Sequence, residues 1–337
     1  MKVSIQKLKE ALSIVRPGLA IKGLMEQTRS FSFLKGFVIT YNDEISIRYP
    51  LEDIDFEGVI EASQFYSFVD KLQKEEMEYQ VKENEIVFKV GRAKAGFVFQ
   101  QVQLPLDIIP EDMKWSKLPE DFLKYLARAK DVCSVDLSRP MLTCVHVLPE
   151  GVLQASDSLR LLQINLGEKI GSNEFLLPSN SARSVVSFVP THIGHSDGWV
   201  HFKRDDGVLL SCRVFDDKYV DFSKYLDVQG NELTFPKSLK SVIEKAAVFS
   251  KRDFLLEEVV SVEVAPRRLT IRSNSDSGWF EETLNMRYKG PEFSFQIAPI
   301  ALSDILEDTT KAVISDSLLS FKTDNWIYVS AYTKKEE

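Results

Sequence analysis

An apolar pattern with helical spacing recurs six times along the chain. In five segments, apolar residues stand at positions i, i+3, i+4 and i+7, which places them on one face of an amphipathic helix. The sixth segment fits three of these four positions. Steps of 57, 57, 60, 57 and 63 residues separate the segments, and such regularity indicates an internal structural repeat. The leading apolar residues are Leu8, Phe65, Phe122, Ala182, Leu239 and Leu302.

Prolines support this register, because each stands three or four residues before a leading apolar residue. They are Pro119, Pro178, Pro236 and Pro299. Proline is tolerated in the first turn of a helix, where its missing N–H would have no partner. The pattern therefore predicts six helices, over residues 5–16, 62–74, 119–131, 179–189, 236–252 and 299–309.

Between the helices, apolar and polar residues alternate as they do in strands, and turn signals such as Asp205-Asp206-Gly207 separate the runs. A short extended run also precedes three of the prolines, at 175–177, 233–235 and 295–297. The repeating unit is therefore one strand, one helix and three strands. The clearest strands are predicted at 78–82, 86–90, 97–103, 200–203, 208–215, 259–264, 269–273 and 318–323.

Each repeat exposes one apolar helix stripe and one apolar sheet face, so two repeats packed together would form one α+β domain. Six repeats predict three domains, at 1–115, 116–226 and 227–337. No linker rich in Pro, Gly or Ser marks the joins near 115 and 227. We therefore expect the three domains to abut rather than to flex.

Composition narrows the location of the protein. The chain has 337 residues, of which 44% are hydrophobic, but no apolar run approaches the ~20 residues of a membrane span. The first residues, Met1–Ser4, lack the apolar core of a signal peptide. Three cysteines without CxxC spacing indicate reduced thiols. We expect a cytoplasmic protein with no membrane partner.

Charge is distributed unevenly. The net charge is −8, yet the six predicted helices contain 14 Lys and Arg against 9 Asp and Glu, about +5, which leaves about −13 elsewhere. A basic helical layer suits contact with DNA phosphates, which is electrostatic and carries no sequence information. The alternative is an ordinary solvated face of amphipathic helices. The sixth helix departs from a basic surface, because it carries Asp304, Glu307 and Asp308.

Motifs for catalysis or metal binding are missing from the sequence. His192 and His195 have no cysteine or third histidine nearby, so we interpret them as ordinary loop histidines. The stretch Gly91–Gly96 has the glycine spacing of a phosphate loop but lacks the Lys-Ser/Thr that should follow, and it predicts a turn between strands. No GxSxG, HExxH or GxGxxG motif occurs. We predict no cofactor, no metal and no enzymatic activity.

Several stretches resemble one known family in the same order along the whole chain. Ser138–Val147 (SRPMLTCVHV) and Val152–Leu161 (VLQASDSLRL) resemble the middle-domain signature of bacterial β sliding clamps, the β subunits of DNA polymerase III. Further similar segments are Phe31–Ile39, Gly91–Lys94, Asp216–Phe222 and Ala246–Arg252. The departures suggest a divergent clamp, such as a phage-encoded one or a second copy.

The resemblance implies a processivity factor that encircles double-stranded DNA without sequence specificity and is not an enzyme. Two chains would close head to tail into a ring with helices inside and sheets outside, so the protein would be a homodimer. At the ring joint, Phe97 and Phe99 would meet Val248 and Phe249 of the other chain; plain intradomain core is the alternative for these four residues. The DNA-contacting candidates by position are Lys7, Lys22, Lys71, Lys124, Arg128, Lys130, Arg183, Lys240 and Lys245.

The family also implies an apolar groove between the second and third domains, into which DNA polymerases, the clamp loader and other partners insert a short peptide. Ser158 and Leu159 replace a Gly-His of the family, and Ser330-Ala331-Tyr332 replaces a Met-Pro-Met before a charged tail, so the peptide preference is open. The predicted groove residues are Ser156, Leu159, Arg160, Leu161, Val228, Tyr328, Ser330 and Tyr332.

A second hypothesis stays open at this stage. The acidic sixth helix and the pI of about 5.3 also suit a clamp-fold interaction protein that binds clamp-binding peptides without encircling DNA.

Overall fold

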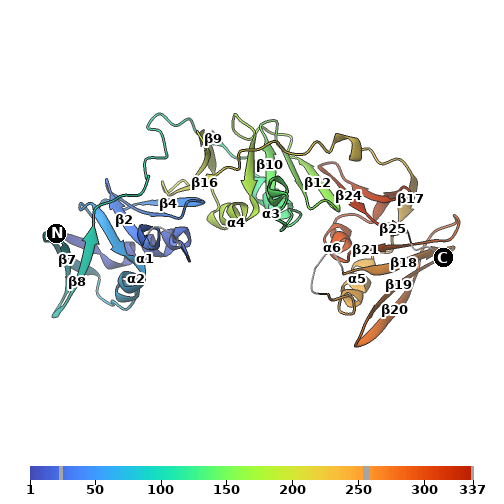
Figure 1. The fold of residues 1–337 in the computed structure, drawn as a ribbon, viewed down its shortest axis with the longest axis horizontal. Coiled ribbons are helices and arrows are strands. Elements are labelled where there is room, and N and C mark those ends of the chain that lie inside the picture. The colour runs from blue at the N-terminus through green and yellow to red at the C-terminus, as the bar shows by residue number, and fades with distance from the viewer. Residues whose placement is uncertain (23–25, 253–257, 335–337) are drawn as a thin grey trace. The chain divides into compact units, whose positions relative to one another are not determined.

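The computed structural model describes residues 1–22, 26–252 and 258–334. The described chain repeats one order of elements six times: a strand, a helix and three strands (Figure 1). We call these segments repeats 1 to 6. The repeating unit predicted from the sequence is therefore confirmed.

Repeats 1 to 3 occupy the N-terminal half of the chain. Repeat 1 is β1 (Lys2–Ser4), α1 (Ile5–Val15), β2 (Ser30–Leu34), β3 (Phe37–Tyr41) and β4 (Ile45–Pro50). Repeat 2 is β5 (Gly58–Glu61), α2 (Ala62–Asp70), β6 (Glu76–Val81), β7 (Glu85–Val90) and β8 (Ala93–Gln100). Repeat 3 is β9 (Ser116–Lys117), α3 (Phe122–Lys130), β10 (Cys144–Leu148), β11 (Val152–Ser156) and β12 (Arg160–Asn165).

Repeats 4 to 6 follow the same order. Repeat 4 is β13 (Phe175–Pro178), α4 (Ser179–Phe188), β14 (His192–Ser196), β15 (Trp199–Lys203) and β16 (Leu209–Arg213). Repeat 5 is β17 (Asn231–Thr234), α5 (Leu239–Ala247), β18 (Val260–Ala265), β19 (Arg268–Ser275) and β20 (Gly278–Asn285). Repeat 6 is β21 (Phe293–Ile297), α6 (Ile300–Ser303), β22 (Lys311–Ile314), β23 (Leu318–Lys322) and β24 (Trp326–Ala331), after which β25 (Thr333–Lys334) follows.

The helices form where the apolar spacing predicts them. Each of the six leading apolar residues is at most 1% exposed, because the helix stripe packs into the interior. Side chains also fix helix starts: the Ser4 hydroxyl accepts from the Lys7 backbone N–H, and the Glu61 carboxylate accepts from the N–H groups of Ser63 and Gln64.

The predicted helix ends need correction. Helices α3 and α5 begin three residues after Pro119 and Pro236, because each proline carbonyl first accepts the N–H of the third residue on in a turn. The sixth helix is a short α segment, α6, followed by a 3-10 turn, η6 (Ile305–Glu307). The eight strands predicted between the helices correspond to β6, β7, β8, β15, β16, β18, β19 and β23.

The chain divides into two compact units by its internal contacts. Unit 1 comprises residues 1–127, 147–150 and 168–217, and unit 2 comprises residues 128–146, 151–167 and 218–337. The predicted division into three domains cuts the chain differently and stays a prediction.

Strand pairing joins the repeats in pairs. In unit 1, β1 of repeat 1 pairs with β6 of repeat 2, and β5 of repeat 2 pairs with β2 of repeat 1. In unit 2, β17 pairs with β22 and β21 pairs with β18, which is the same reciprocal exchange between repeats 5 and 6. Each repeat of such a pair thus contributes strands that pair with the other repeat, as expected if two repeats pack together.

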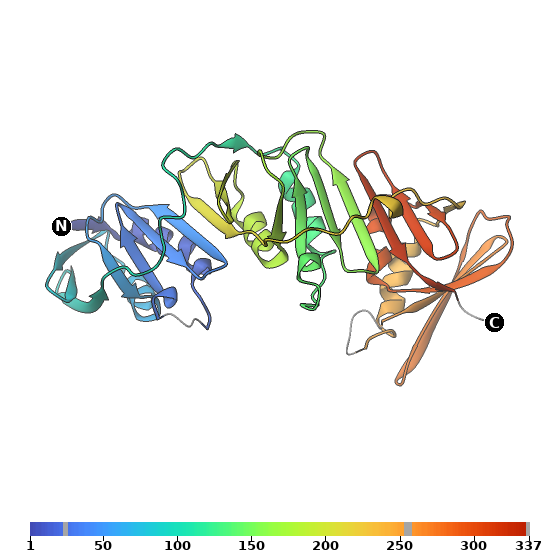
Figure 2. The same ribbon diagram turned by 45° about the horizontal axis from the view of Figure 1, so that its top comes forward.

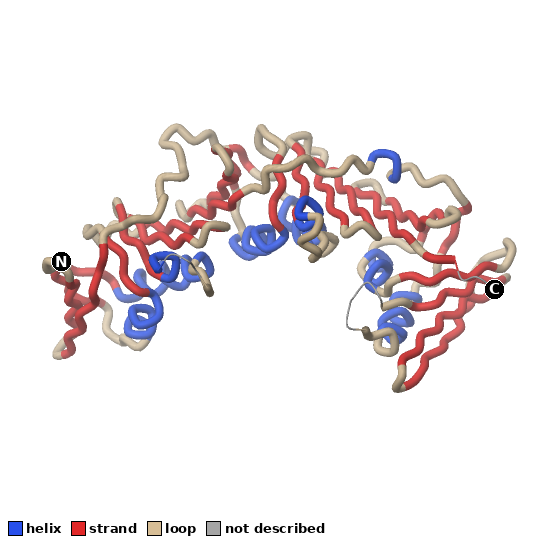
Figure 3. The backbone as a smooth tube through the Cα atoms, viewed as in Figure 1, coloured by secondary structure: helices blue, strands red, loops and turns tan. Residues whose placement is uncertain are grey.

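Unit 1 contains a twelve-stranded antiparallel sheet in the order β1-β6-β7-β8-β5-β2-β3-β4-β16-β15-β14-β9. Unit 2 contains the run β11-β12-β24-β23-β22-β17 and a five-stranded sheet β20-β19-β18-β21-β25. Within each unit, the helices lie on one face of the strands (Figures 2 and 3). Phenylalanines fill the space beneath α2, where Phe65 packs against Phe31, Phe33 and Phe88.

Within the described ranges, no helix has the length and apolar character of a transmembrane span.

Candidate nucleic-acid face and apolar groove

Four of the cations predicted to contact DNA stand clear of carboxylates. Lys22, Lys71, Lys124 and Arg183 are exposed, and none makes an ion pair with another described residue. Lys124 places its ammonium 5.0 Å from the ring centre of Tyr125, on its own helix. Lys71, Lys124 and Arg183 belong to or adjoin α2, α3 and α4, so the helix layer presents free positive charge at these positions.

Lys7 has an acidic partner instead, and so do the four predicted DNA-contacting cations of unit 2, Arg128, Lys130, Lys240 and Lys245. Lys7 on α1 lies 3.3 Å from Asp53, and Lys130 lies 2.6 Å from Asp131. The ammonium of Lys245 contacts Glu282 on β20. The predicted basic layer is therefore partly neutralised within the chain.

The acidic side chains of repeat 6 take part in this neutralisation. Arg128 on α3 contacts Asp308, and its guanidinium also lies 4.6 Å from the ring centre of Trp326. Lys240 on α5 contacts Glu307 and lies 3.8 Å from Glu244. The acidic residues of the predicted sixth helix thus neutralise candidate DNA contacts, because Asp308 pairs with Arg128 and Glu307 pairs with Lys240.

Unit 2 also contains an apolar groove with a volume of about 600 Å³. Its floor is a buried cluster of Leu142, Leu161 and Phe222. This size lies within the range of about 300–1,000 Å³ that is common for ligand sites. The groove is lined by Arg139, Met141, Leu142, Ser156, Ser158, Leu159, Arg160, Leu161, Val220, Phe222, Tyr225, Leu318, Val329 and Ala331.

A network around Arg160 fixes one wall of the groove. Arg160 Nε donates to Asp157 Oδ2 across 2.8 Å, and its Nη2 donates to the Asp131 carbonyl across 2.7 Å. The other oxygen of Asp157 accepts the backbone N–H groups of Leu159 and Arg160, each at 3.0 Å. The Ser156 hydroxyl donates to the Arg160 carbonyl across 2.8 Å. The segment therefore forms a rigid turn between β11 and β12.

Ser158 sits in this turn with φ +80°, a left-handed conformation that glycine adopts without steric cost. At this position, the similar segment of the β sliding-clamp family has Gly, and this chain has Ser. The backbone geometry therefore explains why glycine would suit this position, although this chain carries serine. Ser158 also accepts from Arg139 Nη1 across 3.3 Å, which ties the turn to the segment before β10.

Four of the eight predicted groove residues line the groove, namely Ser156, Leu159, Arg160 and Leu161. The other four, Val228, Tyr328, Ser330 and Tyr332, do not. On β24, Val329 and Ala331 face the groove, and alternate strand residues point to opposite sides of a sheet. The prediction at the C-terminus was therefore one residue out of phase. Tyr332 packs against Phe295, with 4.9 Å between ring centres.

Sequence reasoning missed eight apolar lining residues: Met141, Leu142, Val220, Phe222, Tyr225, Leu318, Val329 and Ala331. A signal for two of them was present, because Met141 and Leu142 belong to the Ser138–Val147 stretch that carries the family resemblance. Phe222 likewise ends the Asp216–Phe222 stretch. The 3-10 turn η4 (Ser223–Tyr225) places Tyr225 at the groove, and the sequence patterns used above did not predict this turn.

The four residues predicted at a ring joint have different environments. Phe97 packs against Phe65, Phe68 and Phe88 at ring-centre distances of 5.2, 5.5 and 5.9 Å, while remaining half-buried. Phe99 lies 6.4 Å from Phe56 by the same measure. Both phenylalanines thus contribute to the core of unit 1.

In unit 2, Val248 is 66% exposed, and Phe249 stacks on Phe280 of β20 at 6.2 Å. Neither observation tests a contact with a second chain, so the joint stays a prediction.

The third strands of the repeats differ in their partners. Strand β4 of repeat 1 pairs with β16 of repeat 4, and β12 of repeat 3 pairs with β24 of repeat 6. By contrast, β20 ends its sheet, and β8 pairs with β5 only through Phe99 and Gln100. Among the described residues, β20 and the 93–98 part of β8 each keep one edge without a strand partner. Each strand also exposes an apolar side chain, Val98 and Trp279, both at 74%.

The sequence features that could suggest metal binding or a phosphate loop are parts of ordinary strands and turns. His192 and His195 lie in β14 rather than in a loop, three positions apart, so they face opposite sides of the sheet. The two-residue turn Gly91-Arg92 joins β7 to β8, as predicted. The described residues include no group of three or more His, Cys, Asp or Glu side chains placed to hold a metal.

The three cysteines are buried and form no disulfide. Burial raises the pKa of the Cys144 thiol to about 11, so this thiol is protonated and unreactive at neutral pH.

No family model and no curated protein matches this chain. Solved structures do match over nearly the whole length. They include the β subunit of DNA polymerase from Streptococcus pyogenes, with TM-score 0.84 and 19% identity, and the DNA polymerase sliding clamp of Bacillus subtilis, with TM-score 0.83 and 18% identity. In both cases the match covers 99% of this chain and 99% of the other.

A third match is the sliding clamp of Pseudomonas aeruginosa bound to griselimycin, with TM-score 0.80, 16% identity and 99% of each chain covered. The chain has the fold of bacterial DNA polymerase III β subunits.

Proposed function

We propose that this chain is a DNA sliding clamp, a processivity factor that encircles duplex DNA and tethers a replicative polymerase without catalysing a reaction. The observation that carries the proposal is the full-length match to the sliding-clamp fold together with the six complete repeats. Lys71, Lys124 and Arg183, on or next to α2, α3 and α4, form no ion pair with a described residue and suit contact with phosphates, which needs positive charge but no base recognition. We infer that it acts in the cytoplasm.

The proposed ring is a homodimer, and the unpaired strand edges support this. Repeats 1 and 4 join through their third strands, and so do repeats 3 and 6. The third strands of repeats 2 and 5 are β8 and β20, and each keeps an edge without a strand partner among the described residues. These two edges can therefore pair with each other between two copies. Because both edges lie on one chain, β8 of one copy pairing with β20 of a second copy would form two equal joints and leave neither of these two edges open.

Retention on closed DNA tests the encircling function. A ring threaded by DNA stays on a covalently closed circle and slides off the same molecule after linearisation. We expect a dimeric mass by light scattering, and retention on circular but not on linear DNA after the clamp has been loaded. A stable monomer, or equal retention on both forms of DNA, would refute the proposal.

The joint itself can be tested with one charge. Val98→Lys places a charge at the exposed edge strand β8, and we expect the dimer to dissociate at least tenfold more readily. Val135→Lys is the matched control, because Val135 is 92% exposed and lies in the loop between α3 and β10. An unchanged mass distribution for Val98→Lys would exclude this edge as the joint.

The DNA contacts are tested with Lys71, Lys124 and Arg183, which form no ion pair with a described residue. Changing all three to Glu should shorten retention on closed circles at least tenfold, because repulsion replaces attraction at three phosphates. Changing Lys289, Arg287 and Lys322 to Glu gives the same change in net charge at exposed positions outside the helices. An equal effect of both triple variants would indicate a general charge effect instead of a contact surface.

The proposed peptide partners are a DNA polymerase, the clamp loader and other proteins that carry a clamp-binding motif, and the groove of unit 2 would hold their peptides. Its apolar floor of Leu142, Leu161 and Phe222 suits a short extended peptide with large apolar side chains. Titration of a labelled polymerase-tail peptide against the wild type and Leu161→Glu tests the assignment. We expect saturable binding that the substitution abolishes.

A second candidate function is supported by the ion pairs of Arg128 and Lys240. A clamp-fold protein whose cations are neutralised could bind clamp-binding peptides without encircling DNA. Under that function, the wild type binds the peptide but is lost equally from circular and linear DNA, and the triple Glu variant at Lys71, Lys124 and Arg183 binds the peptide as the wild type does.

A further inference from the structure

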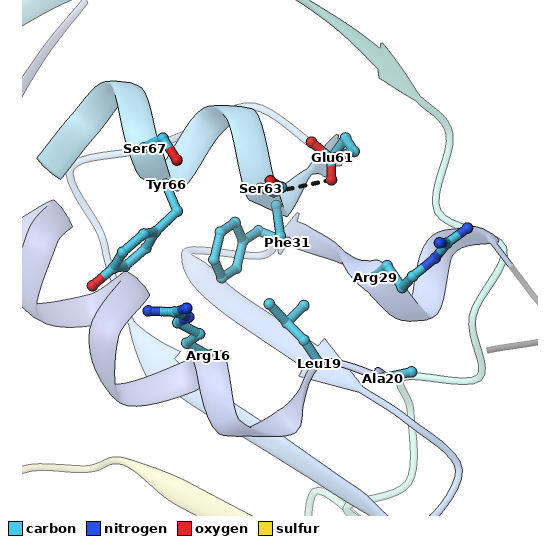
Figure 4. Close-up of a pocket in the computed structure, with 10 residues that line it drawn as sticks. Arg16, Leu19, Ala20, Arg29, Phe31, Glu61, Ser63, Tyr66 and Ser67 are labelled. Carbon is cyan, nitrogen blue, oxygen red and sulfur yellow. Dashed lines mark hydrogen bonds between the residues drawn. The ribbon is translucent and has the colours of Figure 1, made fainter. Parts of the chain in front are cut away.

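Unit 1 contains a second pocket, which the proposed clamp function does not use. It lies where the end of α1 meets the start of α2, and its volume is about 350 Å³, the low end of the range for small-molecule sites. Figure 4 shows Arg16 and Arg29 on the two sides of Phe31 in this pocket. Polar groups dominate the rim, because three hydroxyl groups, those of Ser63, Ser67 and Tyr66, accompany the two guanidinium groups.

The two arginines are available for a ligand. Neither Arg16 nor Arg29 makes an ion pair with a described residue, and both are exposed. Arg16 is nevertheless held in place, since its guanidinium lies 4.7 Å from the ring centre of Tyr66. Such a cation–π contact leaves the N–H groups at the edge of the guanidinium plane free to donate. The contact therefore orients donors before any ligand arrives.

One acidic group, Glu61, also lines the pocket. Its two carboxylate oxygens accept the backbone N–H groups of Ser63 and Gln64, each at 3.0 Å, so it serves as the N-cap of α2. The partial positive charge of the helix start offsets part of its negative charge. With two guanidinium groups against one capped carboxylate, the pocket keeps a net positive charge.

The donor set selects the chemistry of the ligand. Two guanidinium groups and three hydroxyl groups offer more donors than the two oxygens of a carboxylate can accept. A phosphate monoester carries three terminal acceptor oxygens and close to two negative charges, which match this set better. The volume leaves room for a sugar-sized group beside the phosphate.

We propose that the pocket between α1 and α2 binds a phosphate monoester, with Arg16 and Arg29 as the principal ligands. The phosphate could belong to a free mononucleotide or to the 5′ end of a DNA strand, and the two sources share the same recognition chemistry. The site does not depend on ring formation, because every lining residue belongs to repeats 1 and 2 of one chain.

Calorimetric titration of the full-length protein tests the site, with inorganic phosphate, deoxyadenosine 5′-monophosphate and deoxyadenosine as probes. We expect the first two to bind and the unphosphorylated nucleoside not to bind. Arg16→Gln and Arg29→Gln should each weaken binding at least tenfold. Arg92→Gln is the matched control, since Arg92 is exposed in the turn between β7 and β8 and does not line the pocket.

Two oligonucleotides that differ only in a 5′-phosphate separate the sources. A preference for the phosphorylated strand that Arg29→Gln removes assigns the pocket to strand ends, whereas binding of the mononucleotide alone assigns it to free nucleotides. Ser63→Ala with Ser67→Ala, which keeps both arginines, should weaken phosphate binding less than either arginine variant. Binding of deoxyadenosine as strongly as its monophosphate, or phosphate binding unchanged in both arginine variants, would overturn the proposal.

Discussion

Arg160 and Asp157 form an ion pair at the wall of the groove, with Nε and Oδ2 2.8 Å apart and each side chain only 9% exposed. The pair is closed off from water, so each charge depends on the other for compensation. Its position in the turn from β11 to β12 connects the stability of unit 2 with the shape of the groove.

Asp157→Asn should therefore destabilise the protein by about 3 kcal/mol, because removing one partner leaves a buried charge without compensation. Denaturant unfolding followed by circular dichroism measures the change. Glu76→Gln is the control, since the Lys2–Glu76 pair is more than half exposed on both sides, and we expect no measurable change there. Equal unfolding midpoints for Asp157→Asn and the wild type would contradict a structural role of the pair.

Tyr225→Ala should weaken binding of a polymerase-tail peptide about tenfold. Tyr225 lines the groove from η4, and 42% of its surface is exposed and can be covered by a bound peptide; tyrosines are frequent energetic anchors in interfaces. Fluorescence anisotropy of a labelled peptide provides the measurement. Leu137→Ala serves as the control, because Leu137 is 79% exposed in the same unit and does not line the groove. Peptide affinity that survives Tyr225→Ala would remove this residue from the site.

Asp308→Asn combined with Glu307→Gln should strengthen DNA binding. The two substitutions free Arg128 and Lys240 from their acidic partners, so up to two more cations can contact phosphates. The slope of log affinity against log salt should steepen by about 1.8, since each phosphate contact contributes roughly 0.9. Glu232→Gln with Asp324→Asn makes the same charge change at exposed positions of unit 2 that form no ion pair with a described residue. If both double variants give the same slope of log affinity against log salt, Asp308 and Glu307 do not keep Arg128 and Lys240 from contacting DNA.

Acid should destabilise the protein through His201. This imidazole is fully buried between Ser196 and Ser211, with Nε2 2.8 Å and Nδ1 2.7 Å from the two hydroxyl oxygens. Burial is the main cause that lowers its pKa from 6.5 to about 4, with smaller contributions from His195 and Arg48. The folded state thus binds its proton less readily than the unfolded chain, so the contribution of His201 to stability is present above pH 6.5.

This contribution is lost as the pH falls from about 6.5 to about 4, and a shift of this size corresponds to roughly 3 kcal/mol. Urea unfolding at a series of pH values measures it. In His201→Gln, the part of the acid dependence in that window should disappear although the protein is less stable at neutral pH. His192→Gln should keep the dependence of the wild type. A His201→Gln variant with an unchanged pH profile would show that other groups cause the acid loss.

The apolar periodicity of the sequence determined the six repeats and the strand–helix–three-strand order. These are local properties, because a helix stripe is set by residues three and four positions apart and a strand face by alternate residues. All six leading residues from Leu8 to Leu302 are buried as this spacing requires. Helix ends were less well predicted, since the turns at Pro119 and Pro236 depend on single backbone hydrogen bonds.

The tertiary structure decided which side chains meet across long sequence distances. Arg128 and Asp308 are 180 residues apart in the chain, and Lys240 and Glu307 are 67 apart, so no local pattern shows that these charges neutralise each other. Strand register decided that Val329 rather than Tyr328 faces the groove, because a shift of one residue moves every side chain of a strand to the other face. The sequence by itself thus determined the repeated architecture, and only the packing of distant strands decided which charges stay free and which residues form the groove.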